Sequence, residues 1–153
     1  MSPEGKSSKL SCMEHLRKLE QVYLSGPFNA YFEPEIKVRE GEADYRFKIH
    51  PEYYHAAQAI HGAIYFKALD DVTFLAANSI VTDVFVFTAS FQIDFLRPVA
   101  AGDIRGFARV TNQEGGRIES TGELFDSEDN LVARGQGIFA RTKIPLELGA
   151  SAV

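Results

Sequence analysis

The chain has 153 residues, a length that fits one domain with an adequate hydrophobic core. Hydrophobic residues make up 45% of the chain and charged residues 24%, which is ordinary for a globular protein and excludes extensive disorder. The formal net charge is −5 and no basic run occurs, so we expect no nucleic-acid partner, because neutralising phosphates requires clustered cations.

The cysteine content and the hydropathy pattern bear on localisation. Cys12 is the only cysteine, which excludes an intrachain disulfide and favours a reducing compartment. The first twelve residues lack the apolar core of a signal peptide, and no segment reaches the roughly 18 apolar residues of a membrane span. We therefore expect a cytoplasmic protein with no membrane association.

The N-terminal third of the chain predicts one helix and two strands. Residues 1–12 are small and polar, and we expect this segment to be disordered. Residues 13–24 carry apolar side chains at helical spacing and end at Ser25-Gly26-Pro27, which predicts a short amphipathic helix. Residues 34–50 alternate apolar and polar residues around a Glu-Gly-Glu interruption, which predicts two strand segments joined by a turn or bulge.

The remainder of the chain predicts one long helix followed by four strands. Residues 62–79 hold apolar residues at helical spacing almost without breakers, which predicts a long, largely buried helix. Strands are expected over 84–98, 103–112, 117–126 and 131–142, with turn residues between them, and we expect these four to form an antiparallel meander.

These elements together predict an α+β fold. A single long apolar helix and a sheet must bury their apolar surfaces against each other, so we expect an antiparallel sheet wrapped around one long central helix. The domain should cover residues 13–144, and residues 145–153 should form a flexible tail.

The predicted central helix contains two adjacent carboxylates, Asp70 and Asp71. At about 100° per residue, the face expected to press on the sheet carries apolar residues. They are Tyr65, Leu69, Val72, Ala76 and Ile80, with Ala68 and Leu75 beside them. Asp71 lies about 100° from this stripe, close to Lys67 and Asn78, which favours a solvated or paired surface acid.

Asp70 lies nearly opposite the stripe, where a surface acid would have polar neighbours. Its helical neighbours are instead apolar: Ala63, Phe66, Phe74 and Ala77. A second apolar face indicates that another subunit covers this side, and a partly desolvated carboxylate there would be a better base. The alternative is an interface acid that pairs with Lys67 and has no chemical role.

The helix is preceded by His61, Gly62 and Ala63. Unpaired backbone N–H groups at a helix start, together with the positive end of the helix dipole, attract an anion or a developing oxyanion. Glycine allows a ligand to approach the backbone closely. By itself this motif is weak, and a lone histidine is more often a structural hydrogen-bonding residue than a catalyst.

Three segments together resemble a known family. They are HGAIYFKALDD (61–71), NS (78–79) and ASFQIDFLRPVAAGD (89–103). Over residues 50–141 the chain resembles the hotdog-fold acyl-CoA thioesterases of the phenylacetic-acid-degradation (PaaI-like) type. The resemblance implies a hotdog fold, a homodimer or dimer-of-dimers tetramer, and sites between two subunits. It implies hydrolysis of acyl-CoA or aryl-CoA thioesters, with no metal or other cofactor because coenzyme A belongs to the substrate.

The resemblance also assigns roles to residues of this chain. Asp70, nine positions after His61, corresponds to the nucleophile or general base. Backbone N–H groups of Gly62 and Ala63 correspond to donors that polarise the thioester carbonyl. Thr88 corresponds to an assisting hydroxyl, although its alternative role is simply that of a residue favoured in strands.

Two positions depart from the family pattern. Ala63 replaces the second glycine that usually follows the histidine. The asparagine expected six residues before His61 is His55 here, and either His55 or Gln58 is a candidate replacement.

The resemblance suggests further residues for substrate binding. Arg97 is one of several candidates for the coenzyme A phosphates, along with Arg117, Arg134 and Arg141. Phe66 and Phe74 suit either an acyl pocket or packing between subunits. A non-catalytic module that binds acyl-CoA or a fatty acyl group is the alternative function. A hotdog dehydratase or hydratase is a weaker third possibility, because its histidine lies in a distinct loop context.

Overall fold

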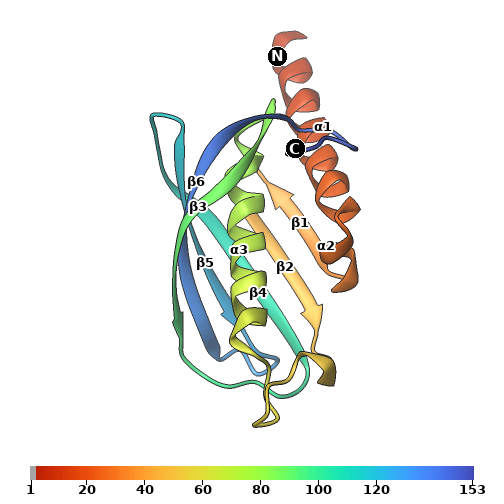
Figure 1. Cartoon of the computed structure of the whole chain (residues 1–153). Helices are drawn as coiled ribbons and strands as arrows, with labels where there is room; N and C mark the ends of the chain where they lie inside the picture. The colour runs from red at the N-terminus through yellow and green to blue at the C-terminus, as the bar shows by residue number, and fades with distance from the viewer. Residues whose placement is uncertain (1–2) are drawn as a thin grey trace.

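A computed structural model describes residues 3–153, with side chains from residue 11 onward (Figure 1). One six-stranded antiparallel sheet curves around the central helix α3, and the helices α1 and α2 lie beside α3. The elements in chain order are α1 Pro3–Ser25, α2 Pro27–Tyr31, β1 Glu35–Arg39, β2 Glu42–Lys48, η1 Pro51–Tyr53, α3 Gly62–Ser79, β3 Val84–Phe95, β4 Asp103–Glu114, β5 Arg117–Phe125 and β6 Leu131–Pro145. The predicted α+β architecture is confirmed.

The strand order differs from the predicted meander. The order across the sheet is β1-β2-β4-β5-β6-β3, so β4, β5 and β6 form a meander, but β3 pairs with β6. The predicted meander assumed that a hairpin turn joins β3 directly to β4. The connection at 96–102 contains Pro98 and instead leads from β3, at one edge of the sheet, to β4 in its interior. Within it, the backbone N–H groups of Leu96 and Arg97 donate to the Val132 carbonyl. As a result, β3 forms one edge of the sheet.

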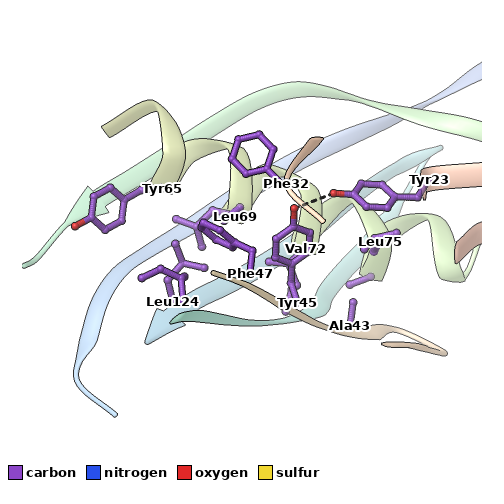
Figure 2. Packing of buried hydrophobic residues seen from close by; sticks show 14 of the residues in the cluster. Tyr23, Phe32, Ala43, Tyr45, Phe47, Tyr65, Leu69, Val72, Leu75 and Leu124 are labelled. Atoms are coloured by element: carbon purple, nitrogen blue, oxygen red, sulfur yellow. Dashed lines mark hydrogen bonds between the residues drawn. The ribbon is translucent and has the colours of Figure 1, made fainter. Parts of the chain in front are cut away.

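The predicted apolar stripe of α3 faces the sheet. Tyr65, Leu69, Val72 and Ala76 are buried, whereas Ile80, beyond the end of α3, is only partly buried. The contact is close because β5 presents Gly122 to the helix, where an added Cβ would lie 2.9 Å from Thr73 Cγ2. Figure 2 shows α3 residues packing with aromatic side chains of the helices and of β2.

Helix α1 begins at Pro3, so the predicted disorder of the first twelve residues is wrong for residues 3–12, while residues 1 and 2 lie outside the described part. The C-terminal half of α1 docks on β1 and α3 and buries Leu19, Val22 and Tyr23. Once docking has fixed a helical turn, each further residue extends the helix at little cost. The short helix α2 then follows immediately from Pro27.

The C-terminal boundary also lies further along the chain than predicted. Strand β6 continues to Pro145, and Leu146 is only 1% exposed, with its N–H donating to the Asp83 carbonyl at 3.0 Å. The ordered packing therefore includes the start of the predicted tail. No helix in the described part of the chain is both long and apolar enough to span a membrane.

Candidate functional site

Asp70 lies on α3 outside the fully buried stripe, next to the edge strand β3, and it is half-buried. The Thr88 hydroxyl, on β3, donates to Asp70 Oδ1 at 2.7 Å. No donor among the described residues contacts Oδ2. Burial raises the pKa of Asp70, opposed by the Thr88 hydrogen bond and the positive charge of Lys67. This carboxylate thus has one oriented oxygen and one oxygen available to a substrate or water.

A cavity of about 270 Å³ lies beside Asp70. Its walls combine aromatic rings with polar groups from α1, α2 and α3. The lining residues are Tyr23, Asn29, Asp70, Asp71, Phe74, Phe85, Val86, Phe87 and Thr88. Such a mixture of apolar walls and a few convergent polar groups is typical of small-molecule sites.

A larger hollow of about 480 Å³ lies elsewhere, along β1, β2, β4 and β5. Three of its five charged side chains already have partners: Arg46 pairs with Asp103, Arg105 with Asp129 and Asp44 with Arg39. We assign the site to the smaller cavity, because that one contains a half-buried carboxylate with an oxygen that no described residue contacts.

Asp71 is not the surface acid that the sequence favoured. It is 8% exposed and forms an ion pair with Lys67, as predicted, and it also accepts from the Tyr23 hydroxyl. Asp71 is buried because α1 and α2 cover this side of α3. Burial raises the pKa of Asp71, opposed by Lys67 and Tyr23. Asn78 instead bonds the chain after α3, accepting from the Val86 N–H at 2.8 Å.

His61, Gly62 and Ala63, at the start of α3, have different hydrogen-bonding roles. His61 is the N-cap of α3, and its Nδ1 accepts from the Ala63 N–H at 2.9 Å. The Gly62 N–H, by contrast, has no acceptor among the described residues. Of the two predicted backbone donors, Gly62 is therefore the available one. The exposed His61 ring holds the turn.

A separate cavity, of about 320 Å³, is lined by Gly62, the residue whose N–H is available. His55 and Arg97 line it together with Tyr65, whose hydroxyl donates to the Arg97 carbonyl at 2.7 Å. Gln58 does not line this cavity and is exposed, with a positive φ of 67°. The structure thus brings His55, rather than Gln58, to the turn.

The predicted aromatic residues divide between two places. Phe74 lines the cavity beside Asp70, whereas Phe66 is 41% exposed and packs edge-on against Phe91, with ring centroids 5.3 Å apart. Sequence reasoning missed Tyr23 and Asn29 as lining residues, because the docking of α1 and α2 is not encoded in local periodicity. Helical spacing did place Tyr23 on the apolar face of its helix.

Strand β3 leaves an apolar margin at the edge of the sheet. Phe87, Phe95 and Leu96 are 47%, 55% and 44% exposed. Within the described chain only one side of β3 pairs, with β6, so the other side presents unpaired backbone groups. Phe87 lies beside Thr88 and lines the Asp70 cavity, whereas Phe95 and Leu96 line the cavity at Gly62.

An antiparallel sheet wrapped around one long helix is the hotdog fold, and comparison with known proteins agrees with it. The model of the Thioesterase superfamily matches residues 57–133, just over half of the chain. The chain therefore belongs to the Thioesterase superfamily.

Several solved structures are similar over most of the chain. A conserved protein from Pseudomonas aeruginosa is 25% identical, with a TM-score of 0.72, over 76% of this chain and 94% of that chain. The PaaI protein of the Escherichia coli phenylacetic acid degradation operon is 23% identical, with a TM-score of 0.75, over 82% and 94% of the two chains. A thioesterase family protein from Silicibacter pomeroyi is 17% identical, with a TM-score of 0.78, over 83% and 97%. The search of curated proteins found no match.

Proposed function

We propose that this protein is a PaaI-like thioesterase that hydrolyses acyl-CoA or aryl-CoA thioesters to the free acid and coenzyme A. Membership of the Thioesterase superfamily supports thioester hydrolysis. The observation that carries the proposal is Asp70, half-buried beside an aromatic cavity, with one oxygen held by Thr88 and the other unbonded within the described chain. A base with a raised pKa and a fixed orientation suits the activation of water.

The active site is proposed to form between two subunits. Gly62 and Asp70 are eight residues apart on one helix, which separates them by about 12 Å along the axis at 1.5 Å per residue. One thioester group cannot contact both in the same chain. The exposed apolar margin of β3 is suited to pairing with a second copy, which would bring Asp70 of one subunit to Gly62 of the other. Homodimers or dimers of dimers satisfy this arrangement.

In this site Asp70 acts as the general base. Its Oδ2 takes a proton from water, the resulting hydroxide adds to the thioester carbon, and the carbonyl oxygen becomes an oxyanion. The Gly62 N–H of the other subunit donates to that oxyanion, an interaction typically worth ~10²-fold or more in rate. The C–S bond then breaks, and the proton passes from Asp70 to the thiolate of coenzyme A. Direct attack by Asp70 on the thioester carbon is the alternative first step.

Three further predicted residues support this chemistry at the start of α3. His61 fixes the turn, and His55 and Arg97 flank Gly62, where the thioester and the coenzyme A chain would enter. We propose that the reaction needs no metal or other cofactor and that it takes place in the cytoplasm.

A non-catalytic acyl-CoA-binding protein is the second candidate. His55 in the position of the expected asparagine favours it, as does the engagement of the Ala63 N–H by His61. The two candidates agree on binding and differ only in turnover.

One assay distinguishes the candidates. The purified protein is given short-chain, long-chain and aryl-CoA thioesters, and release of the free thiol is followed with a thiol-reactive dye. We expect release by the wild type, loss of at least ~10²-fold in Asp70→Asn, and retention in Asp129→Asn, which alters an exposed acid at a positive φ that asparagine tolerates. Tight binding without thiol release would support the binding protein.

A further inference from the structure

Lys67 is a buried cation next to Asp70 that the proposed reaction does not use. It lies three residues before Asp70 and four before Asp71, so the three side chains share one side of α3. Lys67 is only 9% exposed. A buried charge is screened much less by water and salt than a surface charge, and it therefore acts more strongly on its neighbours. Lys67 is placed to influence the charge of Asp70.

Three elements fix the position of the Lys67 ammonium. Its Nζ donates to Asp71 Oδ2 on α3 and to Asn29 Oδ1 on α2, which engages two of its three N–H groups. The ammonium also lies 4.7 Å from the centre of the Phe28 ring and 5.5 Å from that of Phe32, within the range of cation–π attraction. The positive charge therefore stays at one place in the site.

The Asp71 carboxylate is held just as firmly. The Oδ2 atom that pairs with the ammonium also accepts from the Tyr23 hydroxyl. The hydroxyl oxygens of Tyr23 and Tyr45 are 3.1 Å apart and share a hydrogen bond (Figure 2). Burial raises the pKa of Tyr23, which keeps it protonated as a donor to Asp71. Tyr23 and Asn29 lie outside residues 57–133, so the N-terminal region of this chain supplies much of this clamp.

Few other charges face Asp70. Among the described residues that line its cavity, the titratable ones besides Asp70 are Asp71 from α3 and Tyr23 from α1, whereas α2 and β3 contribute neutral side chains. Thr88 donates to Asp70 Oδ1, and this hydrogen bond favours the ionised form. Like charges disfavour ionisation, so Asp71 opposes it, whereas the Lys67 cation favours it. The charge state of Asp70 therefore depends on the balance within the Lys67–Asp71 pair.

We propose that Lys67 is a positioning residue for catalysis: clamped between Asp71 and Asn29, its ammonium keeps the Asp70 carboxylate ionised and able to accept a proton from water. Asp71 has the complementary role, because an uncompensated cation would make Asp70 a weaker base. The inference deepens the proposed function and rests on it.

The test follows the ionisation of Asp70 directly. In protein labelled with carbon-13 at the aspartate carboxyl groups, the NMR signal that is missing from Asp70→Asn identifies Asp70. Lys67→Met should raise the pH at which Asp70 is half-ionised by about one pH unit, because a nearby opposite charge is lost. Asp71→Asn, which keeps the size of the side chain, should lower it by about the same amount, because Lys67 is no longer compensated. The double variant should lie between the two single variants.

Two further variants separate charge from packing. Lys67→Arg keeps the positive charge and should return the Asp70 midpoint toward the wild-type value. Lys48→Met removes an exposed cation on β2 and should leave the midpoint unchanged, because water and salt screen it. Circular dichroism establishes which variants are folded, and Asp71→Asn decides the test if Lys67→Met is unfolded. A midpoint that does not move in the folded variants, or that moves in the same direction in Lys67→Met and Asp71→Asn, would overturn the proposal.

Failure of this role and failure of the proposed function give different results. If the wild type hydrolyses no thioester, the proposed function fails, and the NMR midpoints still decide whether Lys67 sets the charge of Asp70. If the wild type is active, the pH midpoint of kcat/KM should shift in the same directions as the NMR midpoint. A purely structural role for Lys67 would instead lower kcat/KM by the same factor at every pH, and that result would overturn the positioning role alone.

Discussion

Replacing Lys67 by methionine tests how much the buried Lys67–Asp71 ion pair contributes to the stability of the fold. Lys67 and Asp71 are 9% and 8% exposed, so Lys67→Met leaves a carboxylate buried without its cation. Removing one partner of a buried pair typically costs about 3–5 kcal/mol. The Tyr23 hydroxyl still donates to Asp71, so we take the lower end, about 3 kcal/mol. At roughly 2–4 °C per kcal/mol for a chain of this size, the midpoint should fall by about 6–12 °C.

The loss of stability in Lys67→Met should increase with pH. Burial raises the pKa of Asp71 and Lys67 lowers it, so Lys67→Met raises that pKa further. The loss of stability should therefore be greatest at pH 8 and should shrink at pH 5, where protonation removes more of the buried charge. Thermal unfolding followed by circular dichroism measures both midpoints.

A matched control is available on the surface. Arg134→Met breaks the Arg134–Asp94 pair, whose side chains are 59% and 51% exposed, and such pairs are worth about 0–1 kcal/mol. A loss below about 1 kcal/mol in Lys67→Met, or an equal loss at both pH values, would refute the reasoning about the buried pair.

Two further predictions concern Asp70 and the helix–sheet contact. Because burial raises the pKa of Asp70 and catalysis needs its ionised form, kcat/KM should fall with decreasing pH through a midpoint above the ordinary value of about 3.9, as a pH–rate profile would measure. The same shift makes the folded chain less stable as pH rises through that pKa, so Asp70→Asn should melt at a higher temperature than the wild type at pH 7. Either a midpoint at or below the ordinary value or a lower melting temperature would contradict this. Gly122→Ala should lower the free energy of unfolding by about 1–3 kcal/mol in denaturant unfolding, because its Cβ would lie 2.9 Å from Thr73 Cγ2. Gly115→Ala, the control, has no atom within 4 Å but a positive φ of 57°, and it should lower the free energy of unfolding by about 1 kcal/mol. An equal or smaller loss at Gly122 would contradict close packing between α3 and the sheet.

The central helix and the strands could be predicted because their signals are local. The spacing of Leu69, Val72 and Ala76 identifies the face that meets the sheet, and the same wheel places Asp70 opposite it. The position of β3 could not be predicted in this way, because turn residues reveal where a strand ends but not which strand lies beside it.

The parts of the candidate site that were missed depend on contacts between distant segments. Asp71 resembles a surface acid on the helix alone, and only the docking of α1 and α2 buries it with Tyr23 and Asn29. Likewise, the sequence offered both Gly62 and Ala63 as donors, and only the position of the His61 ring shows which N–H is already bonded.

The central claim, a site shared by two subunits, is tested most directly by mixing two inactive variants. Gly62→Pro removes the proposed donor at the first helical position, which proline tolerates, and His61, with φ −64° and ψ 144°, already has the conformation favoured before proline. Gly62→Ala keeps the N–H and is the control, since its Cβ meets only the exposed Phe95 ring, at 3.3 Å.

Asp70→Asn and Gly62→Pro proteins are unfolded together, refolded at equal concentration, and assayed for thioester hydrolysis. About half of the refolded dimers are mixed, and each mixed dimer has one intact site of its two, so we predict recovery of about a quarter of wild-type activity. Gly62→Ala alone should remain active. A mixture as inactive as its two components, at a concentration where sizing shows dimers, would contradict a site built from two chains.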